Sequence, residues 1–486
     1  MSTLVQLGSP SSLSRVGTEV RSPDGVEKIM LAAVGLGCAG LLFAMFAPGS
    51  AAARGWIGIF WFALICTGGA GYFWLAYKGT TAGIKNHGVF HSDTSNRGVI
   101  GWTLGVAFTA FYVALYWHGE SLQRAFVLLD PLSDLLRTPD PTSSAAQFEE
   151  ICPCGTLGNQ IRVKADQWFL YGTLYTAAVG VLGVRMAMKY RHNRYQLVRT
   201  SSVFFFQLGF AFLIPNVLKA MNQPEFYFTY FWPLKPEYLL PFSQGWTIDG
   251  GSLGLAMIFW GAVMTFIATP VLTYFFGKRW YCSWVCGCGG LAETLGDPWR
   301  QLSDKSDRSW KIERWMIHSV LVAIVAITMI GWLHEHLGRP WWSDGGQALY
   351  YKSYGFVIAA MFSGVIGVGF YPLMGSRVWC RFGCPMAAIL GFFQRFYSRF
   401  RITTNGGQCI SCGNCSTYCE MGIDVRAYAQ RGENIIRSSC VGCGICAAVC
   451  PRGVLRLENG PVSDRFDGAD EPVAELMRSL GIQPRA

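Results

Sequence analysis

Long apolar runs separated by polar segments repeat along most of the 486-residue chain. A helix needs about 20 predominantly apolar residues to cross a hydrocarbon core of roughly 30 Å. Eight runs meet or approach this length, near 29–47, 56–77, 99–117, 167–184, 202–218, 252–276, 315–333 and 353–374. The pattern therefore predicts an α-helical integral membrane protein with about eight transmembrane helices.

The runs differ in how many polar or helix-kinking residues interrupt them. The fifth contains Gln207, Pro215 and Asn216, which are polar or helix-kinking groups that need partners inside a bilayer. We therefore expect other helices to pack against this run and satisfy them. The sixth and eighth runs are the cleanest. Seven or nine spans are the alternative counts.

The distribution of basic residues predicts the orientation. The segment after the fourth run contains Lys and Arg without any acidic residue, and such loops stay in the cytoplasm. Counting alternately from it places the 78–98 and 277–314 segments and both termini in the cytoplasm, and the acidic 119–166 segment outside. The basic residues are Arg185, Lys189, Arg191, Arg194 and Arg199. We expect a multi-pass protein of the inner, cytoplasmic membrane.

The composition agrees with this prediction. Hydrophobic residues make up 51% of the chain and charged residues only 14%. The formal net charge is +10, but the excess lies in short loops between apolar runs. This distribution indicates membrane topology and not a nucleic-acid surface, so we expect no nucleic-acid partner.

From about Arg401 the chain becomes polar, and eight of its 17 cysteines repeat one spacing there. The runs are Cys409-x2-Cys412-x2-Cys415-x3-Cys419 and Cys440-x2-Cys443-x2-Cys446-x3-Cys450-Pro451. This is the spacing of bacterial two-cluster ferredoxins, in which the fourth cysteine of each run ligates the other cluster. It predicts a small α+β domain with two [4Fe-4S] clusters. One would be held by Cys409, Cys412, Cys415 and Cys450, and the other by Cys440, Cys443, Cys446 and Cys419.

Two further observations qualify this motif. Paired zinc sites also use C-x2-C spacing, but two complete runs of four cysteines favour iron–sulfur ligation. Glu420 stands where the usual pattern has proline, and we expect it to alter the turn after Cys419 without removing a ligand. Because the thiols must stay reduced, the domain should face the cytoplasm.

A second cysteine motif occurs twice, at an offset of 98 residues. The first copy begins at Gly277 and contains Cys282 and Cys286, and the second begins at Gly375 and contains Cys380 and Cys384. If each segment is helical, the two thiols of a pair lie about one turn apart. Repetition of a helix-plus-cysteine unit suggests two halves that face each other. The four thiolates suit a third iron–sulfur cluster or copper, or they bind nothing permanently.

These features divide the chain into four predicted parts. Residues 1–251 form an N-terminal membrane region with about five spans, and 252–400 form a membrane core with the two C-x3-C motifs. Residues 401–460 form the ferredoxin domain, and 461–486 form a tail.

Other candidate residues carry weaker signals. Cys152 and Cys154 in the 119–166 segment form a thiol pair that suits a disulfide, a metal or a contact with an external redox partner. His318, near the start of the seventh run, is a candidate for binding a quinone. No two histidines occupy the middle of facing runs, so we expect no haem.

The two C-x3-C motifs after apolar runs, followed by a two-cluster domain, resemble the NapH/NosR family of polytopic membrane ferredoxins, with CcoG as a relative. The resemblance covers about residues 252–460. It implies electron transfer between cytoplasmic clusters and the quinone pool or an extracytoplasmic redox system, together with a redox partner protein. Two features depart from the family. Gly287 and Cys288 replace the proline context of the first motif, and the extracytoplasmic flavin domain of NosR is absent.

We therefore expect a membrane-bound electron-transfer protein, an electron-transfer subunit of an oxidoreductase system. One alternative is a copper-handling or assembly factor, as the CcoG resemblance implies. Another is a redox sensor, although the chain contains no kinase, nucleotide-binding or DNA-binding motif.

Overall fold

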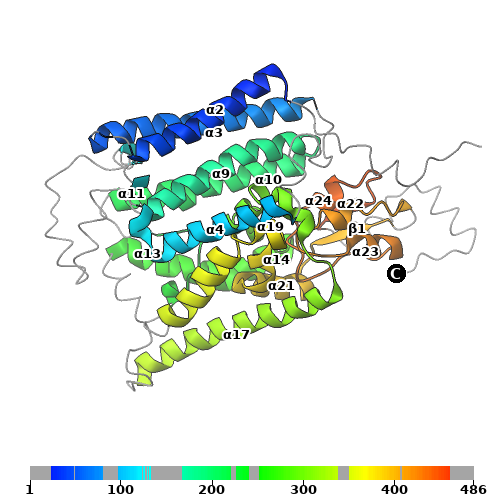
Figure 1. Ribbon diagram of the computed structural model, residues 1–486. Coiled ribbons are helices and arrows are strands. Elements are labelled where there is room, and N and C mark those ends of the chain that lie inside the picture. Colours follow the sequence, from blue (N-terminus) through cyan, green and yellow to red (C-terminus); the bar gives the residue numbers. More distant parts are fainter. Residues whose placement is uncertain are drawn as a thin grey trace, which may run out of the picture.

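The apolar runs form a helical bundle and the cysteine-rich segment folds at one end of it, as the computed structural model of the chain shows (Figure 1). The structure describes residues 23–46, 48, 50–79, 97–122, 124–125, 128–129, 131–132, 167–220, 226–239, 251–337, 350–405 and 408–459. Cys152, Cys154 and the predicted 461–486 tail lie outside these residues.

Seven helices in the described ranges are long and apolar enough to cross a membrane, by length and composition. Their order matches the first seven predicted runs and indicates a multi-pass membrane protein. The single-segment ones are α2 (Gly25–Phe46), α3 (Ala51–Lys78), α4 (Val99–Trp117), α9 (Gln167–Lys189) and α17 (Asp307–Leu337). The fifth joins α10 (Arg194–Phe205), η3 (Phe206–Leu213) and α11 (Ile214–Ala220), and the sixth joins α13 (Gly251–Val263), η5 (Met264–Ala268) and α14 (Thr269–Phe276).

The polar groups of the fifth run do have partners. Gln207 lies in the π-helical segment η3, and its Nε2 donates to the carbonyl of Val285, 2.7 Å away. Asn216 Nδ2 donates to the carbonyl of Phe212 on its own helix at 2.6 Å. The prediction of a partner from outside the helix is therefore confirmed for Gln207, whereas Asn216 is satisfied locally.

The eighth run does not form one long helix. The π-helical segment η7 (Tyr350–Ile366) has 17 residues and is followed by a turn at 367–370 and the short α19 (Tyr371–Met374). The turn contains Gly367 and Gly369, at which an added Cβ would lie 2.2 and 2.1 Å from backbone oxygens of the preceding turn. This helix is shorter than the roughly 20 residues that a span needs. The prediction of one continuous helix over 353–374 was thus wrong beyond Ile366.

Each copy of the unit that repeats at an offset of 98 residues begins at a glycine that ends a helix. Gly277 ends α14 with φ 65° and Gly375 ends α19 with φ 95°, a region that glycine adopts without steric cost. Short helices follow in both copies, namely α15 (Arg279–Cys282) and α16 (Gly287–Thr294), and then α20 (Val378–Phe382) and α21 (Pro385–Phe396). The repeat predicted from the sequence is thus also a repeat of backbone structure.

The cysteine-rich segment forms the predicted α+β domain. Strand β1 (Arg401–Thr404) pairs antiparallel with β2 (Leu455–Glu458), in the register Arg401 to Glu458 and Thr404 to Leu455. Between the strands lie α22 (Asn414–Thr417), α23 (Val425–Arg431) and α24 (Ile445–Ala448). Short 3-10 helices also lie in the described segments between the long helices. They are η2 (Gly119–Leu122), η4 (Pro236–Leu239) and η6 (Asp297–Leu302).

The α+β domain lies at the end of the bundle where α9 meets α10 (Figure 1). Asn193 caps α10 there, since its side-chain oxygen accepts from the amides of Tyr195 and Gln196. The Tyr195 hydroxyl donates to the carbonyl of Gly442 at 2.8 Å. The basic segment after the fourth run and the cysteine-rich domain therefore share one end of the molecule, as the alternating topology predicts.

Candidate metal centres

The first predicted ligand set comes together around one space. Cys409, Cys412, Cys415 and Cys450 all line the same small cavity. Three of these thiols belong to the first cysteine run and the fourth arrives from the second run, so the fold produces the crossed arrangement. Cys415 is buried and Cys412 is exposed, which leaves this site near the surface of the domain.

The backbone explains why the thiols of one run converge. In each run the residues before and after the second cysteine have positive φ, at Ser411 (57°) and Gly413 (79°), and at Gly442 (64°) and Gly444 (72°). Two left-handed residues curl the loop tightly around its centre. Ser411 is the only non-glycine with positive φ in the described part of the chain, and Gln430 Nε2 donates to its hydroxyl at 2.7 Å.

The second predicted set also comes together, at the buried side of the domain. Burial raises the pKa of Cys446 well above its usual range, and the thiolates of Cys443, Cys440 and Cys419 raise it further. Cys415 of the first set acts in the same direction, so thiols of both sets lie close enough to Cys446 to repel it as thiolates. Soft metal ions relieve this repulsion, and an iron–sulfur cluster provides them.

The C-x3-C pairs are not arranged as a single helix would place them. Cys282 ends α15 and Cys286 caps the start of α16, while Cys380 lies in α20 and Cys384 caps α21. A turn separates the thiols of each pair, so the one-turn helical spacing considered above was wrong. The turn follows from the helix break at Ser283 and at Gly383, and all four thiols belong to one buried cluster.

All four of these thiols are buried, with exposed fractions of 5–7%. Burial raises the pKa of Cys384 well above its usual range, and the charges of Cys380, Cys282 and Cys286 raise it further. The Arg377 guanidinium donates to Cys380 Sγ at 3.7 Å and to the carbonyl of Cys282 at 3.2 Å. Arg377 thus joins the two copies of the repeat.

Cys286 has a different environment. A hydrogen bond from the neighbouring thiol of Cys288 lowers the pKa of Cys286 to about 7, even though burial opposes this. Cys286 is therefore the most readily ionised of the four thiols, and Cys288 assists it. The sequence left Cys288 as a spare thiol without a role.

Glu420, the residue in place of the usual proline, has a clear structural role. Its side chain is fully buried, and its carboxylate accepts from Arg300 at 2.7 Å and pairs with Arg377 at 3.0 Å. Glu420 directly follows a predicted ligand of the second cluster, and Arg377 contacts the membrane-core thiols. This one carboxylate therefore connects the two groups of candidate metal ligands.

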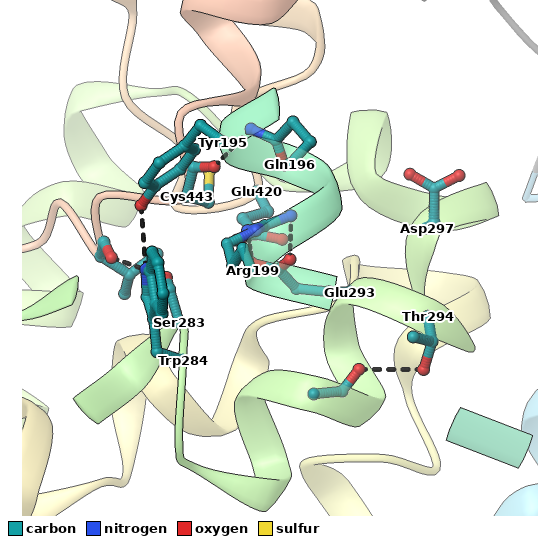
Figure 2. A network of polar contacts seen from close by, with 12 residues as sticks. Tyr195, Gln196, Arg199, Ser283, Trp284, Glu293, Thr294, Asp297, Glu420 and Cys443 are labelled. Carbon is teal, nitrogen blue, oxygen red and sulfur yellow. Dashed lines mark hydrogen bonds and ion pairs between the residues drawn. The ribbon is translucent and has the colours of Figure 1, made fainter. Parts of the chain in front are cut away.

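Glu420 belongs to a larger network of buried charges, part of which Figure 2 shows. Arg199 of α10 and Arg377 both pair with Glu293 of α16. Burial alone would raise the pKa of Asp297, but Lys189, Arg185 and Arg300 hold it well below its usual range. The network comprises five bases and three acids, namely Arg185, Lys189, Arg199, Arg300 and Arg377 with Glu293, Asp297 and Glu420.

The excess of positive charge fits a metal cluster ligated by thiolates. Buried charges require compensation, and among the described residues the five bases outnumber the three acids. The Nε atoms of Arg377 and Arg199 are buried without a partner there. Lys278 is also buried, and its ammonium donates to the carbonyl of Ser438 at 3.1 Å. Four thiolates and the sulfides of a cluster would supply the missing negative charge and acceptors.

Hydrogen bonds attach the second cluster loop to the bundle. Gln196 Nε2 donates to the carbonyl of Cys443, and Ser283 Oγ donates to that of Val441. Gln394 Nε2 donates to the carbonyl of Cys440 at 2.7 Å. In Figure 2, Tyr195 and Gln196 lie beside Cys443 while Trp284 meets the Tyr195 hydroxyl. The two groups of thiols are therefore held in a fixed relation.

The remaining predicted site residue is placed elsewhere. His318 is exposed on α17, and it is not among the residues that line the cavity around Cys409, Cys412, Cys415 and Cys450. Sequence reasoning noted Glu420 only as a departure from the two-cluster pattern, and it did not single out Arg377 or Glu293. The aligned copies of the repeat did offer a signal, since Arg279 and Arg377 occupy equivalent positions after Gly277 and Gly375.

Two family models match the chain. The one described as "4Fe-4S binding domain" matches residues 258–311 and 355–403, which include both C-x3-C pairs. The one described as "4Fe-4S dicluster domain" matches residues 408–455. These matches support an iron–sulfur protein with [4Fe-4S] clusters in the C-terminal domain.

Curated relatives point to the same chemistry. "Putative electron transport protein YccM" of Escherichia coli (strain K12) is 25% identical over 173 residues, which is 34% of this chain and 47% of the relative. An uncharacterized protein of Methanocaldococcus jannaschii is 25% identical over 164 residues, 34% of this chain and 59% of the relative. The chain spans about half the length of the curated relatives it matches. No solved structure matches the chain. The comparisons support iron–sulfur electron transfer in a membrane.

Proposed function

We propose that this chain conducts single electrons between two [4Fe-4S] clusters in its C-terminal domain and a third thiolate-bound metal centre in the membrane core, and from there to the quinone pool or an extracytoplasmic partner. The contact that carries the proposal is that of Arg377 with both Glu420 and Cys380. Through it, the residue that follows Cys419 and the membrane-core thiol of Cys380 share one buried guanidinium.

Three sets of four cysteines would each hold one metal centre. Cys409, Cys412, Cys415 and Cys450 would hold the outer cluster, Cys440, Cys443, Cys446 and Cys419 the inner one, and Cys282, Cys286, Cys380 and Cys384 the membrane centre. Clusters of this kind accept and release one electron at a time. Cys412 is exposed, so the outer cluster would lie near solvent, where a redox partner protein would exchange electrons with it.

An iron–sulfur cluster is our preferred occupant of the membrane centre. The family model that spans these four cysteines is described as 4Fe-4S binding. The proposal places the chain with the NapH/NosR type of membrane ferredoxin, in which electrons move across the bilayer in short steps.

We expect about twelve iron atoms and as many acid-labile sulfides per purified chain, about four for each of three clusters. Changing Cys282 and Cys380 together to serine should lower both values to about eight. Colorimetric iron and sulfide assays measure this, and Cys66→Ser, within α3, provides the control. A wild-type value of about eight that does not change in the double variant would remove the third cluster. Stoichiometric copper in its place would favour the assembly-factor function.

We also propose that the cluster domain and both termini face the cytoplasm, which requires the shorter helix η7 to return the chain across the membrane as an eighth crossing. A reporter enzyme that is active only outside the cytoplasmic membrane should be inactive when fused after Asn459, and active when inserted into the 119–166 segment. The physical reason is that basic loops resist translocation. The opposite pattern of activity would reverse the topology.

A further inference from the structure

A cavity of about 210 Å³ lies between the helices directly behind the membrane-core thiols. Residues of α4, α9, η3, α11, α16 and η7 line it. Gly287 and Cys288, which follow the thiol of Cys286 in the chain, form part of its wall. The departure of the first motif from the second, with Gly287 where the second copy has Pro385, therefore lies at the cavity.

One end of the cavity is polar. An added Cβ at Gly287 would lie 2.9 Å from Gln207 Oε1, 2.9 Å from the hydroxyl of Tyr230 and 3.0 Å from that of Tyr175. Three polar oxygens therefore converge on the space that the missing side chain leaves. Tyr175 donates to the Gly287 carbonyl at 2.5 Å, and Gln207 uses its Nε2 on Val285. These bonds fix both side chains, so their positions are set before a ligand arrives.

Aromatic rings form the rest of the wall. Tyr112 and Tyr116 stack with ring centroids 6.4 Å apart, and Tyr171 and Trp168 pack against them edge-on at 6.0 and 5.6 Å. The Thr176 hydroxyl also lines this cavity, and it is buried without a hydrogen-bond partner among the described residues. The space thus offers flat apolar surfaces together with unused hydrogen-bonding capacity.

Two π-helical segments help to shape this space, since η3 contributes Gln207 and η7 contributes Gly364. An added Cβ at Gly364 would lie 2.6 Å from the Tyr116 ring, so glycine lets that ring sit against η7. Irregular helical turns of this kind occur frequently at functional sites.

We propose that this cavity binds the ring of a membrane quinone, with a ring oxygen at the polar end beside Gly287. The inference rests on the proposed function and assigns its quinone to a site. The volume lies below the roughly 300–1,000 Å³ of sites for drug-sized ligands, so the cavity takes the ring and not the isoprenoid chain. Oxidation of a hydroquinone releases two protons and two electrons, and two oxidised [4Fe-4S] clusters take up one electron each.

The location suits this exchange. The bound ring would lie beside Gly287 and Cys288, which directly follow Cys286 in the chain. Electrons would then pass from the ring to the membrane centre without crossing the bilayer in one step. His318 takes no part in this site, which replaces the quinone role considered for it.

The test measures binding without turnover. The full chain is reconstituted in lipid nanodiscs, and short-chain ubiquinone and menaquinone analogues are tested by equilibrium dialysis. We expect Gly287→Ala to weaken binding at least about tenfold, because its Cβ fills the polar end, and Tyr230→Phe to weaken it about fivefold through one lost hydrogen bond. Gly209→Ala is the matched control, because its Cβ meets nothing within 4 Å and Gly209 does not line the cavity.

A photoreactive azido-quinone gives an independent readout, and its label should map to peptides containing Tyr230 or Cys288. Unchanged affinity in both variants, labelling of lipid-facing residues, or displacement of the quinone by phospholipid alone would overturn the site. Iron content, measured on the same samples, separates the two proposals. Full iron without quinone binding refutes only this inference, whereas quinone binding to a chain without clusters refutes only the proposed function.

Discussion

Replacing Glu420 by glutamine is expected to destabilise the attachment of the cluster domain by about 3–5 kcal/mol. The reason is that removing one member of a buried ion pair leaves its partners uncompensated. Glu420 accepts from Arg300 and Arg377, and all three side chains are fully buried. The substitution keeps the shape of the side chain and removes only the charge, which would leave five buried bases facing two acids.

The measurement is denaturant unfolding of the purified chain in detergent, followed by the visible absorbance of the clusters. Glu433→Gln is the matched control, because Glu433 pairs with Arg431 at 3.0 Å but both are about half exposed. Exposed pairs contribute about 0–1 kcal/mol. Equal effects of the two substitutions would show that the Glu420 network does not hold the domain.

A related variant tests whether the buried ion pairs of Glu420 or the usual motif residue at this position determines stability. Glu420→Pro restores the residue that the two-cluster motif usually has at this position. If the motif alone determined stability, this variant would match the wild type. We expect it instead to lose as much stability as Glu420→Gln, because Arg300 and Arg377 lose the same acceptor.

The second large effect concerns the crossed ligands. Changing Cys450 to serine should remove the outer cluster, which is otherwise bound by the first cysteine run, and lower the iron content by about four per chain. The structure places Cys450 at the cavity of Cys409, Cys412 and Cys415. Because cluster binding and folding are coupled, we also expect faster proteolysis around β2.

Double variants decide which cysteines act together. Adding Cys409→Ser to Cys450→Ser should cause no further loss of iron, since both residues serve one cluster. Adding Cys440→Ser should remove about four more iron atoms, since Cys440 serves the other. The reverse result, with Cys440 and Cys450 behaving as one unit, would show that each run holds its own cluster. Iron assays together with the electron paramagnetic resonance of the reduced clusters distinguish these outcomes.

Much of the architecture followed from the sequence because its causes are local. Lipid requires long apolar helices, so composition and length alone predicted the first seven spans. The cysteine spacing predicted the ferredoxin-type domain, since short loops fix where the thiols of one run point. The eighth run shows the limit of this reasoning. Its hydropathy predicted a continuous span, whereas the helix ends at Ile366 and a turn that contains Gly367 and Gly369 follows.

The sequence by itself thus determined a membrane protein with apolar helices, a two-cluster domain and a duplicated cysteine unit. Only the tertiary structure decided which residues of these parts contact one another. Glu420 meets Arg300 across 120 residues of sequence, and Lys189 meets Asp297 across 108. The cavity behind Cys286 is built from six separate helical segments. Such contacts leave no local periodicity or spacing in the chain, because each partner looks like an ordinary loop charge or membrane aromatic until folding brings them together.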